Sequence, residues 1–156
     1  MRETAEAEDA AFEILLVEDD PADAGLAKRA LKEGRILCRV SHVRDGVEAL
    51  AFLRREGGFA DAPRPDLVLL DLNMPRLDGR GVLEAMKGDG ALKSIPVVIL
   101  TTSDVDRDVN ASYLLGANSF ITKPMDMDAF FEAIRSVGEY WFRVVRLPRR
   151  LPHRRP

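Results

Sequence analysis

The segment that decides the fold is Asp66-Leu-Val-Leu-Leu-Asp-Leu-Asn-Met-Pro-Arg-Leu-Asp-Gly79. Its residues 67–70 form a continuous apolar run, without the alternation expected of a strand that has one face in water. Short runs of this kind are typical of strands buried on both faces of a parallel sheet. The run ends at Asp71, which places a carboxylate where the strand leaves the core. The segment therefore predicts a central parallel strand with a polar site at its exit.

Four more apolar runs lie on either side of this segment, at residues 14–17, 36–43, 97–100 and 119–122. The runs 14–17 and 97–100 are also continuous, which favours central positions, whereas 36–43 alternates and is expected nearer an edge of the sheet. Helix-start patterns separate the runs. Five strand–helix units in this rhythm predict an α/β fold, a doubly wound five-stranded parallel sheet with helices on both faces.

Helix boundaries are predicted from short local patterns. Asp20-Pro21 is typical of an N-cap followed by proline at the first helical position. Residues 45–48 and 103–106 have the cap-plus-acid spacing of a helix start. Asp78-Gly79 is interpreted as a turn, because Asp-Gly is a strong turn former. Gly34 and Gly116 are expected to end helices, residues 57–65 to form a polar loop, and a last helix to begin near Asp126, with its apolar face formed by Met127, Phe130, Phe131, Ile134, Val137 and Trp141.

Polar side chains follow four of the five expected strands. Glu18 and Asp19 follow the first run, Asp71 the third, Thr101 the fourth and Lys123 the fifth. Ligand sites of open α/β sheets lie outside the carboxyl ends of the strands, and all these exits share one edge of a parallel sheet. The sequence therefore predicts one site that combines three carboxylates, a hydroxyl and an ammonium group.

Four stretches of the chain, in their order along the sequence, closely resemble the receiver domains of two-component response regulators. They are residues 14–23, 66–79, 96–103 and 116–124. The resemblance covers about residues 13 to 140 and implies a flavodoxin-like (βα)5 fold with strand order 2-1-3-4-5. Three short stretches are similar to the corresponding stretches of single-domain regulators paired with bacterial phytochrome histidine kinases. They are Ser112-Tyr113, residues 116–119 and Tyr140-Trp141-Phe142. A phytochrome-type histidine kinase is accordingly the expected phosphoryl donor.

The resemblance also implies a metal site. Crowded carboxylates repel one another, and a divalent cation relieves that repulsion. Mg²⁺ prefers octahedral oxygen ligation with a few carboxylates and several waters. By resemblance, Asp19 and Asp71 bind Mg²⁺ directly, Glu18 acts through water, and Asn73 contributes its backbone carbonyl.

The same resemblance assigns the phosphoryl chemistry and the switch. Asp71 is the expected phosphoacceptor, which becomes an acyl phosphate, and Thr101 and Lys123 are expected to bind phosphoryl oxygens. Phosphorylation adds about −1.5 to −2 charges near the Thr101 hydroxyl. Phe120 occupies the position of the aromatic that rotates when the family's threonine moves inward. The expected readout face comprises the fourth helix (from residue 103), the fifth strand and the fifth helix.

Two other classes of protein share parts of this pattern. Mg²⁺-dependent phosphohydrolases of the haloacid-dehalogenase type use an aspartyl-phosphate intermediate, but they place a second aspartate two residues later, where this chain has Asn73. Flavodoxin-like FMN binders need a hydroxyl- and glycine-rich phosphate loop after the first strand, and Glu18-Asp19-Asp20 would repel that phosphate. A non-enzymatic signalling module is therefore favoured over both.

Composition limits the remaining function classes. The 156 residues suit one domain, and 46% hydrophobic content is enough to form a core. No apolar run approaches the ~20 residues of a membrane span, and residues 1–13 lack the pattern of a signal peptide. Cys38 is the single cysteine, which favours a reducing compartment and predicts a soluble, cytoplasmic protein. Without the six arginines of residues 143–156, the chain carries 17 basic against 26 acidic residues, which argues against nucleic-acid binding.

The ends of the chain are expected to differ from its body. Residues 1–12 are predicted to be a flexible acidic segment, 13–142 the receiver domain and 143–156 an arginine-rich tail, with no output domain. Tyr140, Phe142 and Leu147 add large apolar side chains beyond the expected core face of the last helix. Such a patch in water is adhesive. We therefore expect a symmetric homodimer through the readout face, with this extension reaching across to the partner. The alternative is a last helix that is one turn longer and folds back on its own domain.

Overall fold

The computed structural model describes residues 12–33, 37–72, 74, 76–102, 119–123, 127–130 and 132. Its centre is a five-stranded sheet in the order β2-β1-β3-β4-β5, in which every neighbouring pair is parallel. The strands are β1 (Phe12–Val17), β2 (Cys38–Val43), β3 (Leu67–Asp71), β4 (Val97–Thr102) and β5 (Ser119–Lys123). The predicted fold class, strand order and edge position of the second run are confirmed.

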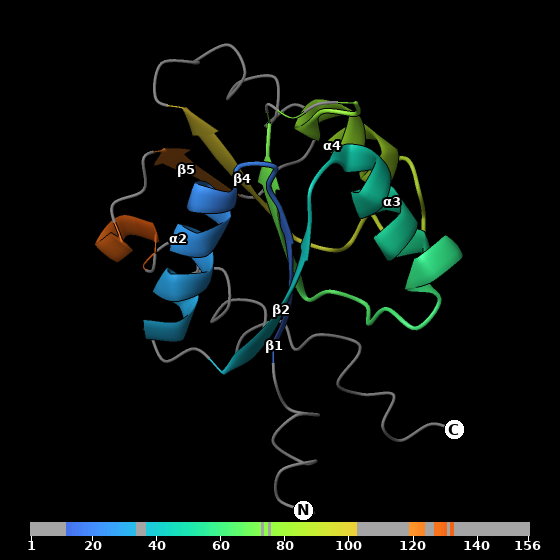
Figure 1. The fold of residues 1–156 in the computed structure, drawn as a ribbon. Coiled ribbons are helices and arrows are strands. Elements are labelled where there is room, and N and C mark those ends of the chain that lie inside the picture. Colours follow the sequence, from blue (N-terminus) through green and yellow to red (C-terminus); the bar gives the residue numbers. More distant parts are fainter. Residues whose placement is uncertain are drawn as a thin grey trace, which may run out of the picture.

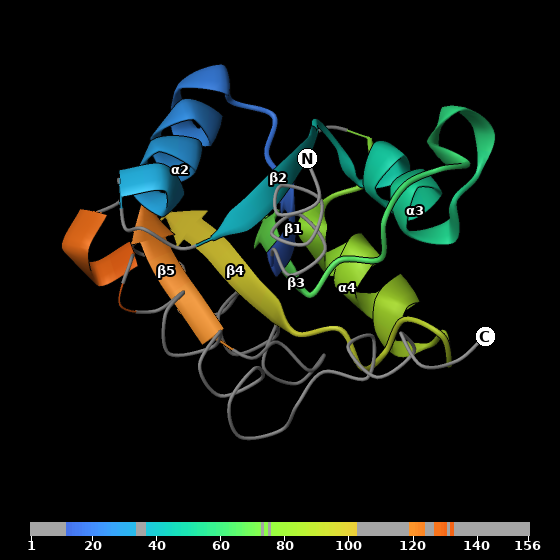
Figure 2. The ribbon, with the colours of Figure 1, turned by 90° about the horizontal axis from the view of Figure 1, so that it is seen from below.

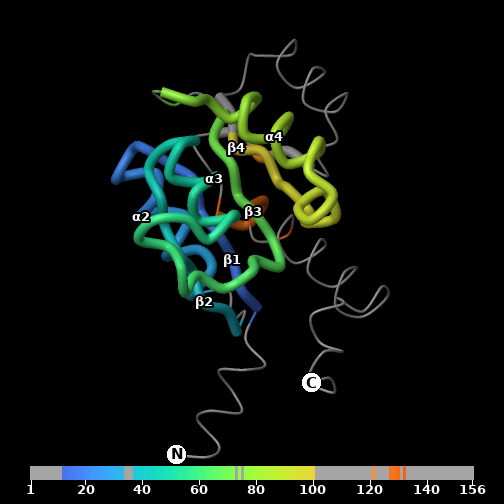
Figure 3. Tube along the Cα trace, turned by 90° about the vertical axis from the view of Figure 1, so that its right-hand side faces the viewer, coloured from blue at the N-terminus to red at the C-terminus, as the bar shows by residue number. Residues whose placement is uncertain are grey.

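The helices lie on both faces of this sheet (Figure 1). They are α2 (Pro21–Glu33), α3 (Gly46–Arg54) and α4 (Gly79–Lys87), with a short 3-10 helix, η1 (Gly57–Phe59), and a helical segment at residues 127–130. The helix α2 and the segment 127–130 lie on one side of the sheet, and α3 and α4 lie on the other (Figure 2). The chain runs along β3 and returns through α4 before it enters the parallel neighbouring strand β4 (Figure 3).

The two faces of the sheet form two hydrophobic cores. On the α2 side, Ile14, Leu16 and Leu69 pack with the alanines of α2 and with Phe130. On the other side, Leu15 and Leu70 pack with residues of α3 and α4. Alternate residues of β1 and β3 thus enter opposite cores, and each fully buried side chain contributes roughly 1.5–3 kcal/mol. The continuous apolar runs are explained by this burial on both faces.

Aspartates cap the starts of the α-helices α2, α3 and α4. Asp20 accepts hydrogen bonds from the backbone N–H groups of Ala22 and Asp23 (2.8 and 3.4 Å), which confirms it as a cap. Asp45 caps α3 by accepting from Glu48 N–H at 2.9 Å. Asp78 caps α4 in the same way, so its interpretation as a turn is corrected: the adjacent Gly79 starts a helix that packs on the sheet. The local sequence Asp-Gly is compatible with either a turn or a helix start, and tertiary packing decides which of the two forms.

Other expectations are refined or lie outside the described residues. The loop at residues 57–65 contains η1, with the ring of Phe59 5.5 Å from that of Phe52. Four of the expected helix boundaries lie outside the described part of the chain: Gly34, Gly116, the helix start at residues 103–106 and the end of the last helix. Among the helices that are described, none combines the length and the apolar character needed to traverse a bilayer.

Candidate metal centre

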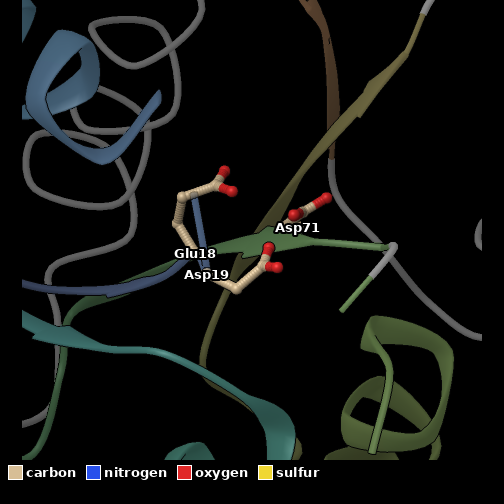
Figure 4. Close-up of side chains that lie close together, drawn as sticks. All are labelled: Glu18, Asp19 and Asp71. Atoms are coloured by element: carbon tan, nitrogen blue, oxygen red, sulfur yellow. The ribbon is translucent and has the colours of Figure 1, made fainter. Parts of the chain in front are cut away.

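Three carboxylates meet where β1 and β3 end (Figure 4). Glu18 and Asp19 directly follow β1, and Asp71 is the last residue of β3. One carboxylate oxygen from each lies within 4.8 Å of the others, and this is the one cluster of three potential metal ligands within the described residues. Glu18 and Asp71 are buried, whereas Asp19 is exposed. The cluster therefore opens to solvent on the side of Asp19.

The backbone of Glu18 is fixed by the neighbouring edge strand. Glu18 N–H donates to the carbonyl of Val43 at 3.1 Å, and the imidazole Nε2 of His42 lies 2.8 Å from the carbonyl oxygen of Glu18. Because that carbonyl only accepts, Nε2 carries the hydrogen. The carboxylate Oε2 of Glu18 also accepts from Asp20 N–H at 3.2 Å. The turn that carries the acids is thus held by β2 at one end and by the start of α2 at the other.

The exit of β3 is shaped by a close backbone contact. A Cβ atom on Gly79 would lie 2.3 Å from the carbonyl oxygen of Asp71 and 2.7 Å from Cα of Leu72. Both neighbours are backbone atoms, so only glycine fits between them without moving the strand exit. Gly79 N–H donates to the carbonyl of Leu72 at 3.0 Å, which closes the loop between β3 and α4 on itself. The start of α4 is therefore packed directly against the backbone of Asp71 and Leu72.

The donors suit a hard divalent cation. Three carboxylates this close repel one another strongly when two of them are buried, and a bound cation offsets that repulsion. All three donors are carboxylate oxygens, the ligands preferred by Mg²⁺, Ca²⁺ and Mn²⁺, whereas zinc and copper sites favour imidazole and thiolate. The exposed side leaves room for waters or a ligand oxygen to complete an octahedron.

Comparison with known proteins decides the family. The family described as "Response regulator receiver domain" matches residues 14–135, which is most of the chain. The chain belongs to the response regulator receiver family. The match extends across the sheet, both helical layers and the acidic cluster. It favours the receiver over the phosphohydrolase, which was the main alternative.

Individual relatives support this assignment. The receiver is 44% identical to the response regulator Rcp1 of Synechocystis sp. over 135 residues, which cover 86% of this chain and 92% of the relative. It is 46% identical to the solved, phosphorylated cyanobacterial phytochrome response regulator RcpA, with a TM-score of 0.75 and coverage of 86% and 96%. A Mn²⁺-bound structure of Rcp1 is 44% identical, with a TM-score of 0.75 and coverage of 88% and 99%.

The other expected site residues of this receiver that the structure describes lie in β4 and β5. Thr101 lies in β4 opposite Thr122, and Thr102 lies opposite Lys123 at the end of β5. The backbones of Thr101 and Lys123 therefore lie at the same edge of the sheet as Asp71, as predicted. Asn73 and the side chains of Thr101, Phe120 and Lys123 are outside the described part of the structure.

Two contacts of the receiver were not expected from its sequence. His42 matched no metal-ligand or catalytic pattern, yet its ring holds the carbonyl of Glu18. Arg76, in the loop after β3, forms an ion pair with Asp45 at the start of α3. Each contact joins residues more than 20 positions apart, so no local spacing signals it. The strand alternation that points His42 to one side of an edge strand is the one available hint.

Proposed function

We propose that this receiver accepts a phosphoryl group on Asp71 from a sensor histidine kinase and signals by a conformational switch. The observation that supports this most is the carboxylate cluster, in which Asp71 contributes a buried oxygen at the end of the central strand β3. An aspartate in that position is reachable from the open side yet shielded by two strands and α4. We take residues 13–142 as the receiver unit of the chain.

In the proposed site, Asp19 and Asp71 bind Mg²⁺ directly, Glu18 acts through a water molecule, and the backbone carbonyl of Asn73 completes the protein ligands. A bound divalent cation supplies positive charge that offsets the charge of the phosphoryl oxygens. The existence of a Mn²⁺-bound form of Rcp1 supports a divalent-cation requirement. Oxygen-only donors and an open side support Mg²⁺.

The residues then perform in-line phosphoryl transfer. A carboxylate oxygen of Asp71 attacks the phosphorus of the phosphohistidine donor, the P–N bond breaks as the O–P bond forms, and the leaving imidazole takes a proton from solvent. The Thr101 hydroxyl donates to one phosphoryl oxygen, and the Lys123 ammonium group binds another. Positioning and charge supply the catalysis, because the activated donor supplies the driving force.

The same groups operate the switch. When Thr101 moves toward the phosphoryl group, it vacates space that the ring of Phe120 enters. The face formed by the segment after residue 103, β5 and the last helix changes as a result. We propose that this face carries the output to a partner protein. RcpA is a phytochrome response regulator, and its similarity to this chain supports a bacterial phytochrome kinase as the donor.

Metal removal tests the proposed function. Incubation with acetyl phosphate and Mg²⁺ is expected to add one phosphoryl group per chain, measured by intact mass spectrometry and radiolabel. Because the carboxylates need a cation to accept more negative charge, EDTA should lower incorporation at least about tenfold, and Mn²⁺ should restore it. EDTA already saturated with Mg²⁺ is the matched control. Undiminished incorporation in EDTA contradicts the metal site, and phosphate release with continued turnover instead of a single stable load favours a phosphohydrolase.

We also propose a homodimer through the segment after residue 103, β5, the last helix and the apolar extension around Trp141. Burial of two such large side chains is worth roughly 1.5–3 kcal/mol each, enough to favour a closed two-fold contact. Truncation after Val137 is expected to give a monomer in sedimentation velocity, whereas the full chain sediments as a dimer. A full-length protein that remains monomeric at high micromolar concentration, with and without a phosphoryl analogue, contradicts the dimer.

A further inference from the structure

The loop between β3 and α4 is fastened to the start of α3 by an ion pair. The guanidinium group of Arg76 donates to Oδ2 of Asp45 from Nε at 2.9 Å and from Nη2 at 2.6 Å. The Asp45 carboxylate is buried, whereas about half of the Arg76 side chain is exposed. Both N–H groups converge on this one oxygen, which ties the guanidinium group to Asp45 by two charge-assisted hydrogen bonds. We call this ion pair the Asp45–Arg76 latch.

The carboxylate of the latch is held in its charged form by groups on two elements. Burial alone would raise the pKa of Asp45, but the hydrogen bonds from Glu48 N–H and from Arg76 outweigh it, so the pKa lies below its ordinary value. The second oxygen, Oδ1, accepts from Glu48 N–H at 2.9 Å. One aspartate thus caps α3 with one oxygen and binds the loop with the other.

The backbone of the loop adopts a conformation that depends on this attachment. Arg76 has a φ of 65°, which lies in the left-handed backbone region that few residues other than glycine and asparagine adopt. Beside it, Gly46 N–H donates to the carbonyl of Leu77 at 3.0 Å, and a Cβ atom on Gly46 would lie 2.2 Å from that same oxygen. An unfavourable backbone conformation next to a closely fitted glycine indicates a loop held by its surroundings.

The far end of the same loop contacts the phosphoacceptor. Two residues after Leu77, Gly79 lies directly against the carbonyl of Asp71 and donates to Leu72. The loop is therefore attached to the start of α3 through Arg76 and Leu77, and the residue that follows it, Gly79, lies against the exit of β3. A rotation of the loop away from α3 would move Gly79, and with it the backbone that carries Asp71.

From these contacts we infer that the Asp45–Arg76 latch is a positioning device for the acidic site, which holds the β3–α4 loop so that Asp71 faces Glu18 and Asp19. Neither Asp45 nor Arg76 belongs to the cluster of three carboxylates that would hold the cation. The inference rests on the proposed function, since it supposes that the acidic cluster binds a divalent cation.

The substitution Arg76→Asn separates the latch from simpler effects. Asparagine tolerates the left-handed backbone, so the substitution removes the ion pair without adding strain. Loss of a positive charge alone would strengthen cation binding. Loss of positioning is expected to weaken Mn²⁺ binding by the full chain roughly three- to tenfold, as indirect coupling between sites allows. Mn²⁺ affinity is measured by electron paramagnetic resonance titration, and stability by thermal unfolding without metal.

Arg29→Asn is the matched control, because Arg29 forms an exposed pair with Glu33 in α2 and the substitution removes the same charge. Its Mn²⁺ affinity should equal or exceed that of the unaltered protein. A second variant, Asp45→Asn, keeps a good helix cap. In that background Arg76→Asn should cause no further loss of affinity, because the latch is already broken. If Arg76→Asn unfolds, Asp45→Asn carries the comparison: it should bind Mn²⁺ more weakly than Asp61→Asn, an exposed variant that removes the same charge.

The outcomes separate the latch from the proposed function. Arg76→Asn protein that binds Mn²⁺ as tightly as the unaltered chain, or more tightly, overturns the latch while leaving the acidic site intact. Losses that add in the double variant also overturn it. Absence of Mn²⁺ binding by the unaltered chain contradicts the proposed function itself. The latch is supported if Arg76→Asn protein binds Mn²⁺ more weakly while its melting temperature is unchanged. The double variant should then lose no more affinity than Asp45→Asn alone.

Discussion

Asp71→Asn protein is expected to incorporate no detectable phosphoryl group from acetyl phosphate or from a phosphorylated histidine kinase. The amide nitrogen and oxygen nearly match the carboxylate in shape, so β3 and its packing should persist. However, a neutral amide is a poor nucleophile toward phosphorus and cannot form an acyl phosphate. It also removes one of three carboxylates that lie within 4.8 Å, so Mn²⁺ affinity should fall together with phosphorylation. Radiolabel and intact mass measure phosphorylation, and Mn²⁺ titration measures the affinity for the cation.

A matched aspartate controls for the substitution itself. Asp61 is exposed in the connection between η1 and β3, away from the carboxylate cluster. Asp61→Asn should therefore take up phosphoryl groups like the unaltered protein. Circular dichroism shows whether Asp71→Asn remains folded. A folded Asp71→Asn chain that still carries one acid-stable, hydroxylamine-sensitive phosphoryl group would place the acceptor on another residue and refute the assignment.

Much of the fold could be predicted from sequence because parallel strands have a strong local signature. Residues 67–70 and 14–17 are apolar without interruption, and in the structure every one of them is buried between two helical layers. The alternating run that becomes β2 lies at the edge, where one neighbour is missing. Strand exits then bring Glu18, Asp19 and Asp71 together without knowledge of any side-chain contact.

Contacts across the sheet edge could not be predicted in this way. His42 contacts the carbonyl of Glu18, and Arg76 contacts Asp45, over separations of 24 and 31 residues. Periodicity reports the burial of one element at a time and contains no information on which loops touch. Asp78 shows the same limit, since Asp-Gly is compatible with a turn or a helix start until α4 is packed against the sheet. The contacts that hold the residues around the site are therefore identified only from the three-dimensional structure.

Gly79→Ala tests the close contact beneath the phosphoacceptor. The new Cβ would lie 2.3 Å from the Asp71 carbonyl oxygen and 2.7 Å from Leu72 Cα, far inside ordinary contact distance. Neither backbone atom can rotate away, so the exit of β3 or the start of α4 must shift. Overpacking of this kind costs about 2–3 kcal/mol of unfolding free energy. The melting temperature should fall by about 4–12 °C in a chain of this size.

Substitution of Gly25 by alanine should raise the free energy of unfolding rather than lower it. Gly25 is exposed in the middle of α2, and a Cβ there meets nothing within 4 Å. Alanine favours the helix and restricts the unfolded chain, so Gly25→Ala should stabilise by about 0.5–1 kcal/mol. Gly79→Ala should in addition lower Mn²⁺ affinity and the rate of phosphorylation, because the displaced backbone carries Asp71. Equal stability of the two variants in urea, or normal phosphorylation of Gly79→Ala, would show that the strand exit accommodates a methyl group and that α4 does not fix the position of Asp71.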